Sequence, residues 1–192
     1  MLPLLLASSS VYRRELLSRL RLTFSCSSPD IDESHRPGEA AHELVKRLSL
    51  EKAQALATSH PAHLIIGSDQ VAVLNEQIIG KPHTFEKARD QLLNASGASV
   101  TFLTGLTLLN SQTGHYQTDC IPFTVHMRTL SPEQIERYLH AEEPYDCAGS
   151  FKAEGLGVSL FQRTEGDDAT SLVGLPLIRL VDMLIAQDVA IP

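Results

Sequence analysis

The sequence predicts a mixed α/β fold in a single domain spanning residues 1–192, and three observations indicate it. Short apolar segments typical of buried strands alternate with amphipathic segments typical of helices. Two long strand-like segments, 99–110 and 116–128, are joined through residues 111–114 and predict an antiparallel hairpin in the middle of the chain. The length of 192 residues is that of one ordinary domain. A purely parallel, doubly wound sheet is therefore not expected.

The first part of the chain predicts a strand, a helix, a loop and a long helix. Residues 2–7 are continuously apolar and end at the serines 8–10, which is typical of a buried strand followed by a helix cap. Residues 39–58 carry apolar side chains at the spacing of one helical face, and they form the clearest helix in the sequence. Between these segments we expect a helix over 11–20, an extended segment around Phe24 and an acidic loop over 29–33.

The second part of the chain predicts further strands mixed with helices. Residues 64–67 predict a second buried strand that ends directly at Ser68, Asp69 and Gln70. After the strand we expect a hairpin of 71–74 with 77–79, a helix over 85–94, the long central hairpin, a helix over 132–140, a glycine-rich strand over 149–161 and a closing amphipathic helix over 177–186.

Composition excludes several kinds of partner. Lys and Arg number 16 against 23 Asp and Glu, which gives a formal net charge of −7. Proteins that bind long nucleic acids or membrane surfaces without specificity present a net basic face, so neither partner is expected. No apolar run approaches the ~20 residues of a membrane span, and no basic leader follows Met1. We therefore expect a cytoplasmic protein with a small ligand.

The cysteines and histidines show no metal-binding pattern. Cys26, Cys120 and Cys147 lie far apart without a CxxC spacing, which indicates reduced thiols in the core. The eight histidines include the near pair His60 and His63, but no HExxH spacing occurs. Walker, dinucleotide-binding and hydrolase-elbow motifs are also absent. The sequence therefore does not indicate a Walker-type NTPase, a dinucleotide-binding protein or an α/β-hydrolase.

Polar residues follow the first two predicted strands. Ser8 to Ser10 precede Arg13 and Arg14 at a helix start, where free N–H groups, hydroxyls and guanidinium groups suit phosphate oxygens. The same serines can simply cap the helix. Asp69 directly follows an apolar strand, where it is either a functional carboxylate or a turn residue. Both clusters are candidate sites, because open α/β sheets bind ligands beyond the carboxyl ends of their strands.

Charged residues elsewhere are compatible with the same chemistry. Asp32 and Glu33 could join Asp69 in holding Mg²⁺, which accepts a few carboxylates together with water and substrate phosphates. Lys52 lies on the polar face of its helix, and Lys81 lies in a Gly-Lys-Pro turn that restricts the backbone. Each lysine taken alone is equally typical of a solvated surface.

Seven segments occur in order along almost the whole chain and together resemble one family. They are Leu-Ala-Ser-Ser-Ser-Val-Tyr-Arg-Arg (6–14), Asp32-Glu33, Glu51-Lys52-Ala53, Gly67-Ser68-Asp69-Gln70, Gly80-Lys81-Pro82, Ala148-Gly149-Ser150 and Val173-Gly174-Leu175-Pro176. The resemblance is to the Maf family of nucleotide pyrophosphatases. It implies an ITPase-like (Maf/Ham1) α/β fold, with a mixed twisted sheet, flanking helices and two lobes around a central cleft.

The resemblance also implies an activity and a set of site residues. The expected reaction hydrolyses a nucleoside triphosphate to the monophosphate and pyrophosphate with a divalent metal cation, Mg²⁺ or Mn²⁺. Asp69 matches the catalytic proton acceptor, and Glu33 with Asp69 matches the metal-binding residues. The matching substrate-binding residues are Ser8, Tyr12, Arg13, Lys52, Gln70, Lys81 and Glu154.

Three of these positions resemble the branch of the family that acts on 7-methyl-GTP. The family's usual Ser-Pro-Arg-Arg is Ser-Val-Tyr-Arg here, so an aromatic residue, Tyr12, stands beside Gln70 and Glu154 as a specificity residue. The 7-methylguanine ring is cationic, and an aromatic face attracts a cation by about 0.5 to 2 kcal/mol. Glu154 could accept two hydrogen bonds from the guanine edge. Tyr12 could instead pack on a neighbour at the helix start.

Two alternatives stay open from the sequence. A dTTP or UTP pyrophosphatase of the same family would keep the chemistry and change the base. A nucleotide-binding regulator of cell division and septum formation would keep the binding site and lose turnover. A homodimer is compatible with the apolar strands and the last helix.

Overall fold

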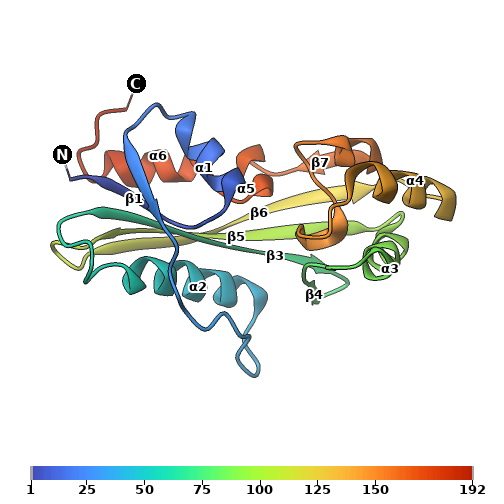
Figure 1. Ribbon diagram of the computed structural model, residues 1–192, viewed down its shortest axis with the longest axis horizontal. Coiled ribbons are helices and arrows are strands. Elements are labelled where there is room, and N and C mark those ends of the chain that lie inside the picture. The colour runs from blue at the N-terminus through green and yellow to red at the C-terminus, as the bar shows by residue number, and fades with distance from the viewer. Residues whose placement is uncertain (1, 192) are drawn as a thin grey trace. The chain divides into compact units, whose positions relative to one another are not determined.

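The computed structural model describes residues 2–191 as a mixed α/β fold with a seven-stranded sheet (Figure 1). The strand order is β2-β1-β3-β5-β6-β7, and β4 pairs with β3. β1 (Leu4–Ala7) is parallel to β2 (Phe24–Ser27) and to β3 (Leu64–Leu74). β4 (Gln77–Ile79) is antiparallel to β3, and β7 (Phe161–Glu165) is antiparallel to β6. The predicted mixture of strand directions is confirmed.

The residues group into two compact units. Unit 1 consists of the residues up to 70, residues 104–121 and the residues from 168 onward, and unit 2 consists of residues 71–103 and 122–167. Strand β3 has residues in both units, and so do the two long strands of the predicted central hairpin, β5 (Ser99–Asn110) and β6 (Tyr116–Met127).

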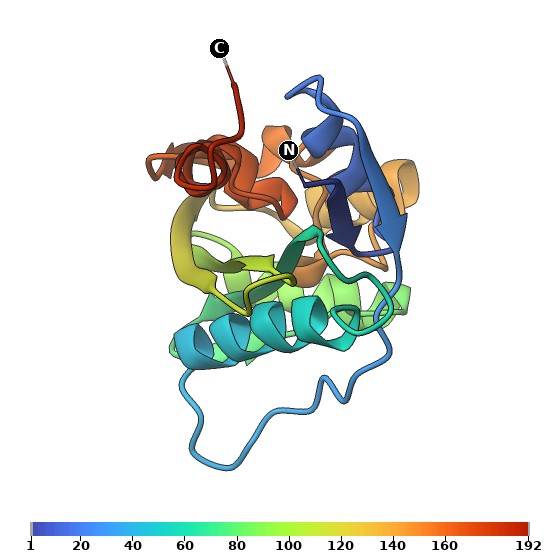
Figure 2. The same ribbon diagram turned by 90° about the vertical axis from the view of Figure 1, so that its left-hand side faces the viewer.

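Unit 1 has helices on both faces of its strands. α2 (Ala41–Ala55) covers one face, and α1 (Val11–Ser18), α5 (Ala169–Val173) and α6 (Leu177–Ile185) cover the other (Figures 1 and 2). Side chains alternate accordingly along each strand. In β1, Leu4 and Leu6 pack in the core that contains residues of α1 and α6, whereas Leu5 and Ala7 pack with Ala53 of α2. This two-sided burial explains why β1 is apolar throughout.

Two glycines let α2 lie close to the sheet. A Cβ atom on Gly67 of β3 would lie 2.0 Å from the carbonyl oxygen of Ser49 in α2, and one on Gly105 of β5 would lie 2.0 Å from that of Val45. Neither position has room for a side chain. The main chain of α2 therefore rests on the main chain of two neighbouring strands.

The helix boundaries differ slightly from those that the sequence predicts. α1 begins at Val11, and the Ser10 hydroxyl caps it by accepting a hydrogen bond from the Arg13 backbone N–H. This helix ends at Ser18, two residues before the predicted end. The predicted helix over 39–58 is α2, which spans Ala41–Ala55.

Unit 2 contains α3 (Phe85–Ala95), α4 (Pro132–Glu142) and two 3₁₀ turns, η1 (Ala148–Ser150) and η2 (Leu156–Leu160). The predicted strand over 149–161 is wrong. Gly149 has a φ of 77°, and a Cβ on Gly157 would lie 2.2 Å from the carbonyl oxygen of Lys152, so the chain turns tightly at both glycines. Strand pairing with β6 begins only at Phe161.

Across residues 2–191, no helix combines the length and the apolar character that crossing a bilayer requires.

Candidate functional site

Strand β3 carries the predicted cluster Ser68, Asp69 and Gln70 in its interior. The sequence predicts that the strand ends at Gly67, but the strand runs on to Leu74. Side chains alternate along a strand, so Asp69 follows Ile65 and Gly67 on the face toward α2. Ser68 and Gln70 point to the opposite face, where they meet residues 171–174. Asp69 is therefore not a turn residue.

Lys52 of α2 joins the two predicted carboxylates. Its Nζ atom lies 2.6 Å from Oδ1 of Asp69 and 3.1 Å from Oε1 of Glu33. The side chains of Lys52 and Asp69 are only 8% and 9% exposed, whereas that of Glu33 is 57% exposed. One buried ammonium group thus holds a buried carboxylate and a carboxylate that solvent can reach.

The site lies beyond the carboxyl ends of parallel strands. β1 pairs with β3 as far as Leu6 with Ile66 and ends at Ala7, so Asp69 extends past the end of β1. Ser8 follows β1 directly, is buried, and accepts a hydrogen bond from the Ser10 backbone N–H. Glu33 lies in the loop that follows the end of β2. This is the position where open α/β sheets bind ligands.

Arg13 is fixed by the last turn before α6. Its Nε atom donates to the Gly174 carbonyl oxygen at 2.8 Å, and the Ser68 hydroxyl donates to the same oxygen at 2.9 Å. Burial lowers the pKa of Arg13, while the charges of Asp69 and Glu33 act in the opposite direction. Arginine titrates so far above neutrality that the group stays charged. The two Nη groups of Arg13 make no other hydrogen bond within residues 2–191 and can serve a ligand.

Gln70 is held through its amide nitrogen. Nε2 lies 2.9 Å from Oγ1 of Thr104, 2.8 Å from the Ser171 carbonyl oxygen and 3.2 Å from the Leu172 carbonyl oxygen. Thr104 donates its own hydroxyl proton to the Ser171 carbonyl, so it accepts from Gln70. Because both amide protons are engaged, a ligand can reach Gln70 only through its carbonyl oxygen. Thr104 is a support of the site that the sequence did not indicate.

Glu33 and Asp69 fit a cation. The Lys52 ammonium lies where the two carboxylates converge and acts as a stand-in positive charge. Two carboxylates are a sufficient protein contribution for Mg²⁺ when substrate phosphates and water complete the shell. Residues 2–191 contain no group of three His, Cys, Asp or Glu side chains that could hold a metal by themselves. The donor set therefore fits a cation that arrives with its substrate.

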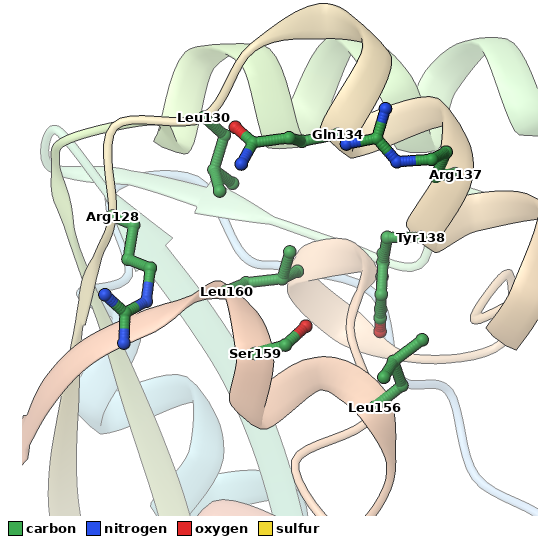
Figure 3. Close-up of a pocket in the computed structure, with 8 residues that line it drawn as sticks. All are labelled: Arg128, Leu130, Gln134, Arg137, Tyr138, Leu156, Ser159 and Leu160. Carbon is green, nitrogen blue, oxygen red and sulfur yellow. The ribbon is translucent and has the colours of Figure 1, made fainter.

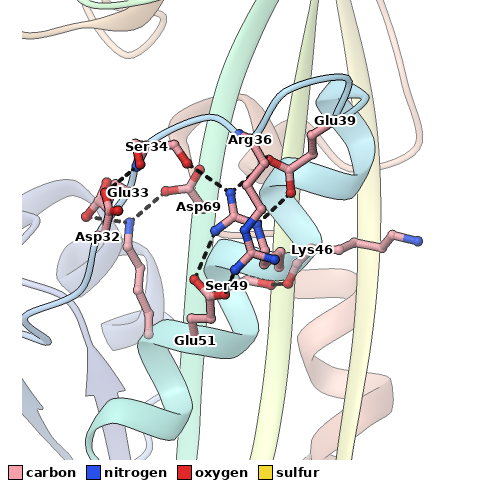
Figure 4. A network of polar contacts seen from close by, with 11 residues as sticks. Asp32, Glu33, Ser34, Arg36, Glu39, Lys46, Ser49, Glu51 and Asp69 are labelled. Atoms are coloured by element: carbon pink, nitrogen blue, oxygen red, sulfur yellow. Dashed lines mark hydrogen bonds and ion pairs between the residues drawn. The ribbon is translucent and has the colours of Figure 1, made fainter.

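A charged network holds the loop that carries Glu33 (Figure 4). Arg47 of α2 contacts Glu39 through Nε at 2.6 Å and Nη2 at 2.8 Å, Glu51 through Nη1 at 3.0 Å, and the Ser34 carbonyl through Nη2 at 3.1 Å. Arg36 reaches Glu51 at 3.0 Å. This network was not predicted from the sequence, although the pair Arg47 and Glu51 has the i, i+4 spacing of a helical ion pair.

The remaining predicted residues are distributed over both units. Tyr12 lies half-buried in the first turn of α1, within unit 1. Lys81 and Glu154 are exposed and belong to unit 2. Unit 1 therefore contains seven of the predicted site residues, Ser8, Tyr12, Arg13, Glu33, Lys52, Asp69 and Gln70, and it joins Glu33, Lys52 and Asp69 by direct contacts. The roles of all the predicted site residues stay predictions.

Unit 2 contains a cavity of about 280 Å³ that none of the predicted site residues lines (Figure 3). Its walls come from the segment between β6 and α4, from α4 itself and from η2. The lining residues are Arg128, Leu130, Gln134, Arg137, Tyr138, Leu156, Ser159 and Leu160.

The cysteines are free thiols, as the sequence predicts. Burial raises the pKa of Cys120 to about 11 and that of Cys147 to about 12. Cys26 is exposed, which corrects the prediction that all three pack in the core.

Two curated relatives are similar to this chain over nearly their whole length. A 7-methyl-GTP pyrophosphatase of Pseudomonas fluorescens strain Pf-5 is 82% identical over 192 residues, which is 100% of both chains. A 7-methyl-GTP pyrophosphatase of Pseudomonas aeruginosa strain PAO1 is 69% identical over 189 residues, or 98% of each chain.

The fold has a relative among solved structures. The Ham1 protein of Staphylococcus aureus is similar with a TM-score of 0.53 and 13% sequence identity, covering 97% of this chain and 100% of that chain. The sequence profile of the family described as Maf-like protein matches residues 3–187. This match spans nearly the whole chain, and the chain therefore belongs to the Maf family.

Proposed function

We propose that the protein hydrolyses 7-methyl-GTP to 7-methyl-GMP and pyrophosphate. The chain covers the full length of relatives that carry the name 7-methyl-GTP pyrophosphatase. The observation that carries the proposal is the contact of the Lys52 ammonium with both Asp69 and Glu33. It places a buried carboxylate, a buried cationic group and a solvent-accessible carboxylate side by side.

Asp69 is the proposed proton acceptor. Cleavage of the α–β phosphoanhydride bond needs a water molecule that is aligned with the α-phosphorus and loses a proton as it attacks. Asp69 would orient that water and accept its proton. An aspartate in a model peptide is a weak base, with a pKa of about 3.9. A bound divalent cation, held by Glu33 and Asp69, would lower the pKa of water and neutralise phosphate charge.

The basic residues of unit 1 would bind the phosphates. Arg13 is oriented by its Nε contact with Gly174, so its Nη groups can donate to phosphate oxygens. When phosphate oxygens enter, Lys52 can exchange its contact with Glu33 for a contact with them. Ser8 would add a hydroxyl donor, and Lys81 would stabilise the charge that develops on the pyrophosphate leaving group.

Tyr12, Gln70 and Glu154 are the proposed readers of the base. The ring of Tyr12 would attract the cationic 7-methylguanine. The guanine N1–H and exocyclic amine are donors, so they suit the carboxylate of Glu154 and the free carbonyl oxygen of Gln70. Because nucleoside triphosphates are cytoplasmic metabolites, the proposed reaction implies a cytoplasmic enzyme.

The test is pyrophosphate and monophosphate release from 7-methyl-GTP, GTP, dTTP and UTP, each with Mg²⁺, with Mn²⁺ and with a chelator. We expect the highest kcat/KM with 7-methyl-GTP and no release without metal. A preference for dTTP or UTP would contradict the assigned base specificity and keep the enzyme class. Nucleotide binding without release by folded, metal-loaded protein would favour a regulator.

A further inference from the structure

We infer that Arg47 is a positioning residue, which holds the loop of residues 33–39 so that Glu33 stays at Lys52. The inference rests on the proposed function, because Glu33 is one of its two metal-binding carboxylates. Arg47 itself contacts neither Lys52 nor Asp69. Its effect on the site passes through the loop.

Arg47 binds the loop at two places. Its Nη2 atom donates to the Ser34 carbonyl oxygen at 3.1 Å, immediately after Glu33 in the chain. Its Nε and Nη2 atoms form a forked pair with the two carboxylate oxygens of Glu39, at 2.6 and 2.8 Å. The loop is thus attached to α2 beside Glu33 and again at its end.

The fork is shielded from solvent and has further support. The side chains of Arg47 and Glu39 are 13% and 10% exposed, far less than those of a usual surface ion pair. The hydrogen bonds from Arg47 lower the pKa of Glu39 to about 2, so the carboxylate is charged at neutral pH. Glu51 accepts from Arg47 at 3.0 Å and from Arg36 of the loop at 3.0 Å.

Only arginine has the geometry for this set of contacts. A guanidinium group presents five N–H donors in one plane, whereas a lysine ammonium is a single point. Arg47 and Lys52 also belong to the same helix, α2. Helix α2 therefore fixes the loop through Arg47 and contacts the two carboxylates through Lys52. Glu33 stays at Lys52 as long as Arg47 holds the loop at Ser34 and Glu39.

The first experiment measures hydrogen exchange of residues 30–39 in the full-length protein without ligand. We expect Arg47→Met and Arg47→Lys to speed exchange of this segment at least tenfold and to leave β1 and β3 unchanged. The matched control is Lys46→Met, because Lys46 is the neighbouring residue of α2 and pairs with Glu43 outside the loop. Unchanged exchange in both Arg47 variants would overturn the inference.

The second experiment asks whether Arg47 acts through Glu33. The Mg²⁺ concentration for half-maximal pyrophosphate release should rise at least tenfold in Arg47→Met, with kcat at saturating metal within threefold of the parent. The same substitution in a Glu33→Gln background should change the metal dependence less than threefold, because coupled residues are not additive. Equal effects in both backgrounds would overturn the positioning role.

The two experiments separate this inference from the proposed function. If the parent protein releases no pyrophosphate, the proposed function fails, and the exchange experiment alone decides whether Arg47 holds the loop. If exchange accelerates but the metal dependence of an active parent does not change, Arg47 has a structural role only and the inference is wrong.

Discussion

The Nζ atom of Lys52 lies 2.6 Å from Oδ1 of Asp69, although one residue belongs to a helix and the other to the interior of a strand. Both side chains are buried. A buried ion pair is costly to break from one side, because the remaining charge has no partner in a medium of low dielectric constant. The pair should therefore contribute to the stability of the fold, whatever it does in the reaction.

Replacing Lys52 should reduce both stability and activity. We expect Lys52→Met to lower the free energy of unfolding by about 3 kcal/mol or more, since Asp69 is left buried and unpaired. Urea unfolding checks this. Lys46→Met on the same helix should change the free energy by less than about 0.5 kcal/mol, because its ion pair with Glu43 is exposed. An equal effect of the two variants would contradict the role of the buried pair.

Replacing Asp69 should separate chemistry from folding. Asp69→Asn keeps the size of the side chain, and the Lys52 ammonium keeps its contact with Glu33 at 3.1 Å, so the chain should still fold. The variant removes the base, so kcat should fall by about 10² or more, the usual effect of a lost general base. Circular dichroism should show the native spectrum. Asp90→Asn, on the exposed face of α3, is the control. A kcat within threefold of the parent would exclude Asp69 as the proton acceptor.

The amide of Gln70 should be intolerant of charge. In Gln70→Glu an oxygen replaces Nε2 and faces the carbonyl oxygens of Ser171 and Leu172, so hydrogen bonds become repulsions. A lost buried partner costs about 1 to 3 kcal/mol. Thermal unfolding should show a lower Tm than in Gln54→Glu, which changes an exposed residue of α2 in the same way. An unchanged Tm would mean that the amide nitrogen is not held as described.

The ion pair of Arg47 with Glu39 should give acid sensitivity below pH 4.5. The pKa of Glu39 is lowered from 4.5 to about 2 by the hydrogen bonds from Arg47. The unfolded chain therefore binds more protons in this interval, and the stabilisation present above pH 4.5 is lost as the pH falls towards 2. Urea midpoints at pH 5 should differ between the parent and Glu39→Gln, and the difference should shrink towards pH 2. A difference that is constant with pH would show that the pair is not responsible.

The pattern of neighbouring residues predicted most helices and strands. It did not predict that polar residues can lie inside a strand when distant parts of the chain supply their partners. The apolar run before Ser68 predicts where β3 begins and wrongly predicts where it ends. Ser68 and Asp69 remain within the strand because their partners are Gly174 and Lys52, which are 106 and 17 residues away in sequence. No window of neighbouring residues contains that information.

Local pattern indicated Arg13, Lys52 and Asp69 as candidate site residues, and the family resemblance assigned their roles. Only some of the supports of the site could be predicted from spacing. The contact of Arg47 with Glu39 joins a helix to a loop eight residues earlier, a separation that no periodic rule covers. The glycine-rich segment 149–161 predicted a strand because glycine does not reveal its φ angle in sequence. In the structure, the positive φ of Gly149 is that of a turn and is incompatible with an extended strand.

The contact of α2 with Gly67 and Gly105 also bears on how the protein can change in evolution. Layers separated by side chains adjust when a core residue is exchanged, but a layer of main chain against main chain has no such freedom. The distance between Lys52 and Asp69 should therefore stay constant when apolar core residues are substituted during evolution. The same packing makes the site sensitive to substitution at these two glycines, since one added methyl group at either of them would displace the helix that carries Lys52.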